Sequence, residues 1–465
     1  MREKQIRVVP STWLEKEGRR LDCRPYLSGA IEAKLLINRM SVKKEPLHSL
    51  TKGHDGGIYN GPQFVRNYVS DPKHGIPFLT SSSMLLADLT RVDLLRRQDA
   101  LSAKLSHLRL EEGMTLISCS GTIGRMVYAR PEMTGMWSSQ DVLKVVPDPE
   151  KIPPGYLHAF LASRFGVPLV VGGTYGAIIL HIEPGHIRDL PVPRVGALRE
   201  SEIHTLVQQA AALRREAMDR LLASRSRFDC YRPPEAEVVS SPRISVVESG
   251  SVAKRMDAAF HDPKATAVER LVRTGKHTTV GEFCDQVFLP GIFKRIHVQE
   301  LRYGAPYYSG ASLFWIEPAP KGILGRRTKL FDDVVLKQGT ILIQAFGQDG
   351  GLIGRLTWVG AHLDGVTTTH MLVRIRPFDR GLTGWLWAFL DSEAGYSLLR
   401  RLPYGGSIPH LDEAVTKTVL IPLAGQKEME KLSADVLGAL DQRGKALELE
   451  RRARRLVEET IEGGA

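Results

Sequence analysis

The sequence has few cysteines and no long apolar run, and each shortage excludes a class of protein. The four cysteines lie far apart, at positions 23, 119, 230 and 284, without a Cys-x-x-Cys pair. A zinc site or a disulfide scaffold is therefore not expected, and the pattern suits a reducing cytoplasm. The best candidate for a membrane span, Val167 to Ile182, is broken by glycines, Thr174, Tyr175 and His181. No membrane-spanning segment is predicted.

Signature motifs of common nucleotide-binding and nucleic-acid enzymes are also missing. The sequence has no Gly-x-x-x-x-Gly-Lys-Ser/Thr phosphate loop and no Asn/Asp-Pro-Pro-Tyr/Phe tetrapeptide of the kind found in amino-methyltransferases. Ser120 has no Gly-x-Ser-x-Gly elbow around it. His181 and His410 have no repeated metal-ligand partner at helical spacing. The sequence therefore predicts no catalytic constellation, no metal site and no cofactor of its own.

The composition is that of a globular protein with a moderate basic surplus. Hydrophobic residues make up 43% and charged residues 25% of the 465 residues, which excludes global disorder. A chain of this length is too long for one compact core and suits two or three domains. Lys and Arg outnumber Asp and Glu by 63 to 52, which gives a net charge of +11. This surplus is compatible with a polyanionic partner.

An internal repeat organises the chain. The segment Gly155-Tyr-Leu-His-Ala-Phe-Leu-Ala-Ser163 returns as Gly384-Trp-Leu-Trp-Ala-Phe-Leu-Asp-Ser392, an offset of 229 residues. Further pairs follow in the same order: Phe64-Val-Arg66 and Phe293-Lys-Arg295, Gly75-Ile-Pro-Phe78 and Gly304-Ala-Pro-Tyr307, Gly124-Arg125 and Gly354-Arg355, Tyr175-Gly176 and Tyr404-Gly405, His181 and His410, Leu190-Pro-Val-Pro193 and Val419-Leu-Ile-Pro422. A collinear series of this length indicates a tandem duplication.

Each copy ends in a segment of helical periodicity. Residues 199–227 contain no Gly or Pro and carry apolar residues at 3–4 spacing, and residues 426–462 show the same spacing among Glu and Arg. This pattern predicts two long amphipathic helices, each seeking a helical partner. Gly438 and Gly444 are unfavourable to a continuous second helix. Two ordinary surface helices would be the alternative.

Inside each copy the pattern alternates between strands and helices. Short strands are expected over 113–119, 142–146, 339–345 and 371–376, and helices over 156–163 and 385–392. The segment 230–250, which contains three prolines and little periodicity, is expected to link the copies.

The repeated polar and glycine positions are the candidates for binding. Ser120-Gly-Thr-Ile-Gly-Arg125 and its lengthened counterpart Gly347 to Arg355 combine small residues with a terminal arginine. Glycines let backbone N–H groups approach a phosphate closely, and arginine adds a bidentate contact. A solvated turn would explain the same residues without DNA. For the tyrosines at 175 and 404, core packing is an equal alternative to contact with a base.

The order of these blocks resembles the specificity subunit of type I restriction–modification systems. The resemblance rests on Ser120 to Arg125, Ser139 to Leu143, Gly155 to Leu161, Tyr175-Gly176 and Leu190 to Pro193, and it covers nearly the whole chain twice. In the second copy Thr368-Thr-His370 replaces Ser138-Ser-Gln140, which is a departure expected of halves with different specificity.

The resemblance implies an α/β (α+β) fold with two tandem target recognition domains separated by two long antiparallel coiled-coil helices. The expected parts are a first target recognition domain (1–198), a first spacer helix (199–229), a linker (230–250), a second target recognition domain (251–425) and a second spacer helix (426–462). The residues expected to bind DNA are Arg66, Ser120, Thr122, Gly124, Arg125, Gln140, Tyr175, Gly176, Lys294, Arg295, Gln348, Arg355, His370, Tyr404, Gly405 and Ser407.

The function implied is that of a non-catalytic, cytoplasmic subunit in phage defence. It would read a bipartite, asymmetric target in double-stranded DNA and direct adenine-N6 methyltransferase subunits, docked on the long helices, to that target. S-adenosylmethionine would belong to those partners, and a restriction and translocation subunit could join them. Two alternatives stay open: a targeting or scaffold subunit of a DNA defence complex that does not act through methylation, and an unrecognised nuclease.

Overall fold

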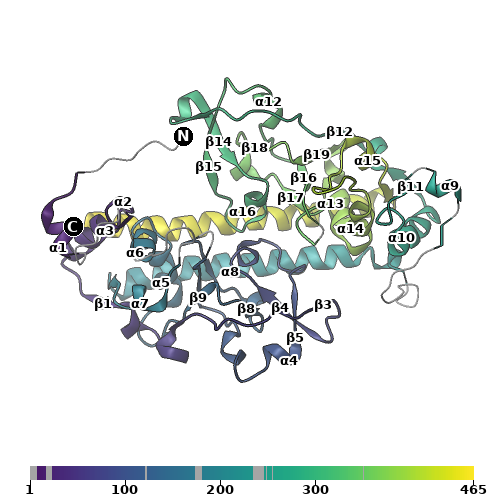
Figure 1. Ribbon diagram of the computed structural model, residues 1–465. Coiled ribbons are helices and arrows are strands. Elements are labelled where there is room, and N and C mark those ends of the chain that lie inside the picture. Colours follow the sequence, from purple (N-terminus) through teal and green to yellow (C-terminus); the bar gives the residue numbers. More distant parts are fainter. Residues whose placement is uncertain are drawn as a thin grey trace. The chain divides into compact units, whose positions relative to one another are not determined.

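The chain folds into two compact units that share both long helices. The computed structural model describes residues 8–16, 24–120, 123–172, 181–233, 246–247, 249–253, 255–348 and 350–464. Unit 1 comprises residues 1–215 and 445–465, and unit 2 comprises residues 216–444. Helix α8 (Ala197–Ser226) and helix α16 (Gln426–Gly463) each contribute to both units (Figure 1). The two predicted long helices are therefore present, in a chain of mixed helix and strand.

In the described residues of unit 1, the strands form three small sheets. The central sheet has the order β2-β9-β6-β7 and is antiparallel throughout. A second sheet has the order β3-β5-β4-β8, in which β4 and β8 run parallel, and β1 pairs with β10. The strands are β1 (Lys44–Pro46), β2 (Ile58–Tyr59), β3 (Tyr68–Val69), β4 (Gly75–Leu79), β5 (Leu94–Arg96), β6 (Thr115–Ser118), β7 (Met126–Tyr128), β8 (Trp137–Ser138), β9 (Val142–Val145) and β10 (Pro191–Pro193).

Unit 2 repeats this topology strand for strand. Its sheets have the orders β12-β19-β16-β17, β13-β15-β14-β18 and β11-β20, and β14 and β18 are again the parallel pair. The strands are β11 (His277–Thr279), β12 (Cys284–Phe288), β13 (His297–Val298), β14 (Gly304–Tyr308), β15 (Pro320–Gly325), β16 (Ile341–Gln344), β17 (Leu356–Trp358), β18 (Thr367–Thr368), β19 (Leu372–Pro377) and β20 (Leu420–Pro422).

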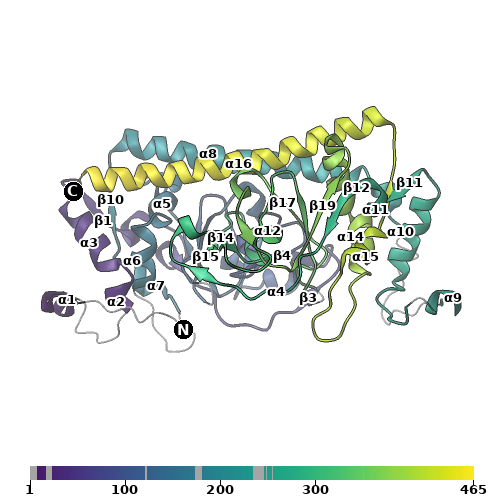
Figure 2. The same cartoon turned by 90° about the horizontal axis from the view of Figure 1, so that it is seen from above.

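Short helices connect and cover these sheets. In unit 1 they are α1 (Ser11–Lys16), α2 (Arg24–Leu27), α3 (Ala30–Arg39), α4 (Arg97–Ala100), α5 (Pro154–Leu161), α6 (Gly166–Gly172) and α7 (Pro184–Ile187). In unit 2 they are α9 (Ser249–Val252), α10 (Pro263–Arg273), α11 (Val280–Phe283), α12 (Phe331–Val334), α13 (Thr383–Asp391), α14 (Glu393–Arg400) and α15 (Glu413–Lys417). Figure 2 shows α3 beside the β1–β10 pair of unit 1.

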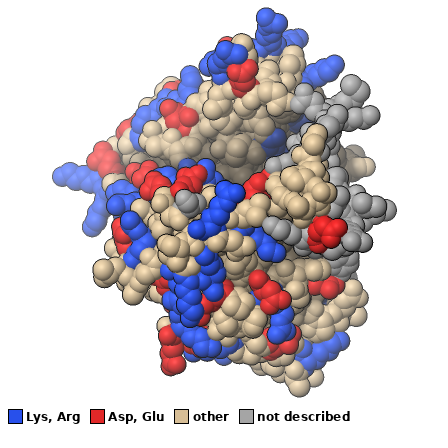
Figure 3. Space-filling view, turned by 90° about the vertical axis from the view of Figure 1, so that its left-hand side faces the viewer, with Lys and Arg blue, Asp and Glu red and all other residues tan. Residues whose placement is uncertain are grey.

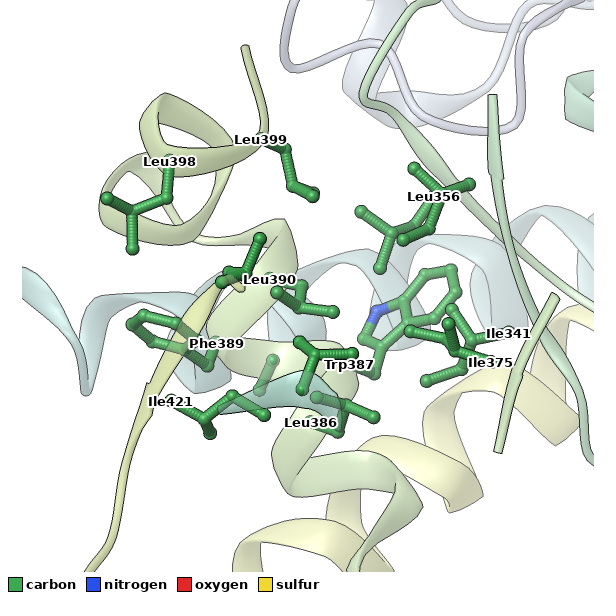
Figure 4. Packing of buried hydrophobic residues seen from close by; sticks show 14 of the residues in the cluster. Ile341, Leu356, Ile375, Leu386, Trp387, Phe389, Leu390, Leu398, Leu399 and Ile421 are labelled. Atoms are coloured by element: carbon green, nitrogen blue, oxygen red, sulfur yellow. The ribbon is translucent and has the colours of Figure 1, made fainter. Parts of the chain in front are cut away.

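Each unit has its own hydrophobic core, centred on one repeated helix. Helices α5 and α13 are apolar on all sides, which is the pattern of a helix buried in a core rather than one lying on a surface. In unit 2, Trp387 and Phe389 of α13 lie among side chains from the central sheet, α14 and β20 (Figure 4). In unit 1, Tyr156 and Phe160 of α5 are equally buried. The predicted helices at these positions are confirmed.

A glycine lets each buried helix approach a long helix closely. A side chain on Gly155 of α5 would lie 3.0 Å from the backbone of His204 in α8, and one on Gly384 of α13 would lie 2.2 Å from the carbonyl oxygen of Ser433 in α16. The amide of Gly155 donates to Nδ1 of His204 at 3.0 Å, and that of Gly384 donates to Oγ of Ser433 at 2.7 Å. The same contact is thus made at equivalent positions by different side chains.

Helices α8 and α16 run antiparallel within unit 2. Arg220 contacts Asp435 at 2.6 Å, and Arg227, further along α8, contacts Glu428, which lies earlier in α16. Helix α16 continues through Gly438 and Gly444, although glycine is unfavourable inside a helix. A side chain on Gly438 would lie 2.9 Å from Nη2 of Arg220, so the glycine makes room for the guanidinium group.

Candidate nucleic-acid interface

The repeated Gly-Arg turn connects two strands of the central sheet in each unit. Gly124 has a φ angle of +76° and Gly354 one of +78°, a left-handed conformation that favours glycine. Their amides donate to the carbonyl oxygens of Ser118 and Gln344, both at 2.9 Å. The glycines are therefore explained by the turn itself. Of the arginines that follow, residue 125 is exposed and residue 355 is half-buried.

The repeated arginines before β3 and β13 have different electrostatic surroundings. Arg66 forms an ion pair with Asp141 at 3.0 Å. At the equivalent place in unit 2, Nε of Arg295 donates to the hydroxyl of Tyr307 at 2.6 Å, and the residue aligned with Asp141 is Met371. Within the described part of the chain Arg295 has no acidic partner. Arg295 therefore retains an unneutralised charge at the surface, and Arg66 does not.

The end of β8 and the loop from β8 to β9, together with the loop from β18 to β19, contain buried polar atoms with unmet hydrogen bonds. They are Oγ of Ser138 and Oε1 of Gln140 in unit 1, and Oγ1 of Thr369 and Nδ1 of His370 in unit 2, judged against the residues that the structure describes. An unmet buried polar atom costs about 1–3 kcal/mol, so native proteins keep few of them without a reason. Both units share this feature, at the equivalent positions of Gln140 and His370.

A row of rings connects this loop to the Tyr-Gly loop in unit 2. His370 lies 5.8 Å from the ring of Phe346, which stacks on His410 at 5.2 Å and 9°. His410 in turn lies 4.5 Å from Tyr404. Burial, reinforced by the charge of Arg295, lowers the pKa of His370, so its imidazole is neutral at pH 7. A neutral imidazole both donates and accepts hydrogen bonds, as contact with a base edge requires.

The Tyr-Gly loop of unit 2 borders a cavity. The hydroxyl of Tyr404 donates to Asp412 at 2.5 Å, which raises the pKa of the tyrosine. Gly405 follows with a φ angle of +108°, and Ser407 is exposed. The cavity has a volume of about 310 Å³, and Tyr404, Gly405 and Arg400 contribute to its lining.

The structure therefore brings Arg295, His370 and Tyr404 into one region of unit 2. Lys294 is exposed beside Arg295, and Gln348 is exposed two residues after Phe346. The described part of unit 1 contains the matching bridge, in which Ser120 pairs with His181 as Phe346 pairs with His410. Three predicted residues lie outside the described part of the chain: Thr122, Tyr175 and Gly176.

No group of three or more His, Cys, Asp or Glu side chains suited to a metal ion occurs in the described ranges. Burial raises the pKa of Cys119 to about 11 and that of Cys284 to about 12, so both thiols stay protonated and unreactive at neutral pH. Figure 3 shows one face of the protein, where Lys and Arg side chains are interspersed with Asp and Glu.

Sequence reasoning missed two buried cations at equivalent positions of the central sheets. Lys144 of β9 lies directly opposite Tyr59 of β2, and Arg374 of β19 lies opposite Phe288 of β12. The cations lie 5.7 Å and 6.0 Å from the centroids of these rings. The available signal was a Lys or Arg flanked by apolar residues, at aligned positions of the two copies.

Comparisons with known proteins give the following results. No protein-family model matches the sequence, and no curated protein matches it. The chain is similar to the solved type I restriction–modification S subunit from M. genitalium, with 12% identity over 91% of this chain and 95% of that chain and a TM-score of 0.30. It is similar to the HsdS subunit from Thermoanaerobacter tengcongensis, with 13% identity over 91% of this chain and 97% of that chain and a TM-score of 0.28. It is also similar to a chain from a structure of complex assembly and conformational transition in the type I R-M system, with 14% identity over 90% of this chain and 97% of that chain and a TM-score of 0.27. At these identities and TM-scores the similarities do not decide the function.

None of the described helices is both long and apolar enough to cross a membrane.

Proposed function

We propose that this chain is the specificity subunit of a type I restriction–modification system, acting in the cytoplasm as two target recognition domains on two spacer helices. The observation that carries the proposal is a repeated scaffold with unlike side chains at matching places. Both units have the same strand order, yet Gln140 corresponds to His370 and Asp141 to Met371. A repeated frame with different polar groups suits the reading of two different half-sites.

Each unit would read its half-site by a different set of contacts. In unit 2, Arg295 supplies charge and the neutral His370 supplies a donor and an acceptor. In unit 1 the charge of Arg66 is neutralised by Asp141, so the unmet carbonyl of Gln140 would carry more of the recognition. Charged contacts to phosphates position a protein on DNA, whereas polar contacts to base edges specify the sequence. The target would accordingly be bipartite and asymmetric.

The long helices would serve as the spacer and as the docking site for partners. Two domains on a stiff spacer meet one face of the duplex only when the separation of their half-sites respects the repeat of about 10.5 base pairs. Adenine-N6 methyltransferase subunits would bring S-adenosylmethionine and the chemistry, and a restriction subunit could join them. The chain itself would recognise the DNA sequence to which these partners are directed.

The test is to map N6-methyladenine in cells that express single variants of the chain together with its methyltransferase. His370→Gln is expected to relax recognition in one half-site, with a loss of about 1–3 kcal/mol of discrimination per lost contact. Arg295→Ala, which removes a charge that positions the protein, is expected to lower methylation at all target sites without relaxing either half-site. Gln140→Ala is expected to relax the other half-site only. The matched control is Arg302→Ala in unit 2, because Arg302 is exposed and already paired with Glu300 at 3.0 Å. Relaxation of both halves by one variant, or a continuous motif, would contradict the proposal.

A further inference from the structure

In unit 2, the loop 291–296 before β13 and the turn 326–330 after β15 lie against each other. The amide of Gly325, the last residue of β15, donates to the carbonyl oxygen of Ile296 at 2.8 Å. The amide of Ile296 in turn donates to Oγ1 of Thr328 at 3.3 Å. The loop and the turn therefore form one continuous piece of the surface of unit 2.

These two segments contain five exposed cations and no acidic residue. The cations, together called the basic surface, are Lys294, Arg295, Arg326, Arg327 and Lys329. Among the residues that the structure describes, none of the five has an acidic partner. Like charges that are left unpaired at this density repel one another, which suits a surface that meets a polyanion.

The nearest acidic residues along the chain do not neutralise the basic surface. Asp332 and Asp333 follow the turn in helix α12, where they line a cavity together with Lys337 and Arg374. The charge of Asp333 acts on Arg374. These carboxylates therefore balance the cations around that cavity.

Unit 1 has neutral residues where unit 2 has most of these cations. The two units match here at an offset of 229 residues, since the amide of Arg96 donates to the carbonyl oxygen of Asn67 as that of Gly325 does to that of Ile296. At this offset three of the five cations have neutral counterparts, namely Val65 for Lys294, Gln98 for Arg327 and Ala100 for Lys329. The basic surface is therefore a property of unit 2.

Carboxylates also neutralise two arginines in the matching region of unit 1. Asp141 pairs with Arg66 at 3.0 Å, and Asp99 pairs with Arg96 at 2.6 Å. Unit 2 has a neutral residue at both aspartate positions. The excess of positive charge on this part of the repeat is therefore much smaller in unit 1.

The basic surface adjoins the groups that are suited to base edges. Phe293, which lies in the same loop between Ile292 and Lys294, has its ring 6.1 Å from that of His370. In a duplex the phosphates flank the edges of the bases, so cations beside a base-reading group can contact the backbone while that group faces a groove. This continuity favours double-stranded DNA over other polyanions.

We propose that the basic surface of unit 2 binds the phosphate backbone of double-stranded DNA irrespective of sequence, and that unit 1 contributes little to this affinity. This role deepens the proposed function and rests on it for the nature of the partner. Duplex DNA has one negative charge per ~1.7 Å of its axis, so several neighbouring cations can contact phosphates at once. Unit 2 holds a duplex of any sequence while the polar groups of both units test the bases.

The test is the salt dependence of binding of the full-length protein to a duplex of random sequence, measured by fluorescence anisotropy without any methyltransferase. The double variant Arg327→Gln/Lys329→Ala gives unit 2 the residues of unit 1. It is expected to flatten the plot of log K against log[NaCl] by about 0.9 per lost phosphate contact, and so by up to about 1.8.

Two further double variants serve as controls. Lys276→Gln/Lys417→Gln removes the same charge from exposed positions beside β11 and at the end of α15, which Figures 1 and 2 place at the opposite end of unit 2 from β15. The slope should not change. Arg97→Gln/Lys104→Gln removes two exposed cations from the matching region of unit 1 and should flatten the slope less than the variant of unit 2 does. Circular dichroism establishes that each variant is folded.

Several outcomes would overturn the proposal. They are the absence of binding to the random duplex, a wild-type slope for Arg327→Gln/Lys329→Ala, and an equal or greater flattening by the variant of unit 1. Equally tight binding to phosphatidylserine vesicles, lost in the same variant of unit 2, would assign the surface to a membrane instead. Because the duplex is not a target and no methyltransferase is present, failure here leaves the methylation map unaffected, and failure of the map leaves this slope unaffected.

Discussion

At the scale of single residues, the two units treat a buried cation in different ways. Lys144 and Arg374 occupy matching places in β9 and β19, each facing an aromatic ring on the neighbouring strand. Burial lowers the pKa of Lys144 to about 7 and that of Arg374 to about 10. Lys144 can therefore lose its charge near neutral pH, whereas Arg374 keeps its charge and its need for a partner.

The lowered pKa of Lys144 predicts a stability that rises with pH. Between about pH 7 and the usual lysine value of 10.5, the unfolded chain binds a proton at this residue that the folded chain does not. The free energy of unfolding should therefore increase with pH in this window, by up to about 1.4 kcal/mol per pH unit from this group. Urea unfolding at pH 7.5 and 9.0 measures it, and Lys144→Met should remove the increase.

The control for this prediction is Lys73→Met, because Lys73 is exposed. That variant should keep the full increase between the two pH values. If Lys144→Met unfolded with the same pH dependence as the wild-type protein, the rise would come from other groups and the buried ammonium would not be its cause.

At the scale of elements, each unit is organised by the contact between its buried helix and a long helix. The residue after the glycine is Tyr156 in α5 and Trp385 in α13, yet each donates a hydrogen bond to the last strand of its unit. The hydroxyl of Tyr156 donates to the carbonyl oxygen of Pro193, and Nε1 of Trp385 donates to that of Pro422 at 3.0 Å. The helix is thus fixed both to the last strand of the unit and to the long helix that follows it.

This contact predicts that Gly384→Ala destabilises unit 2. The new methyl group would lie 2.2 Å from a backbone carbonyl oxygen, which a rotamer change cannot relieve. Overpacking of this kind costs about 1–3 kcal/mol, so the urea midpoint should fall measurably. Gly185→Ala in helix α7 is the matched control, since no atom lies within 4 Å of the added methyl group. Equal midpoints for the two variants would show that α13 and α16 are not packed so closely.

The sequence sufficed to predict the long helices, the two buried helices and the strands β6, β9, β16 and β19, but neither the remaining strands nor the contacts between elements. The predicted elements follow from periodicity, which is a local property. The ion pair between Arg66 and Asp141 joins residues 75 positions apart, and only the folded sheets bring them together. The same holds for the ring row from His370 to Tyr404. Repeated positions identified some members of that region but could not show that Phe346 connects them.

At the scale of the whole molecule, the two units share a strand order and differ at matching polar positions. Identical strand orders provide two similar platforms. Differences at matching polar positions, such as Gln140 against His370, provide two different surfaces. A duplicated protein with identical surfaces would favour a symmetric target, whereas unlike surfaces favour an asymmetric one.

The most direct test is a map of modified bases in the host genome, made with the gene intact and with the gene deleted. Deletion is expected to remove N6-methyladenine from one split, asymmetric motif, and reintroduction of the gene is expected to restore it. An unchanged map would contradict the proposed function, because methylation at the target cannot persist once the subunit that recognises the target is removed.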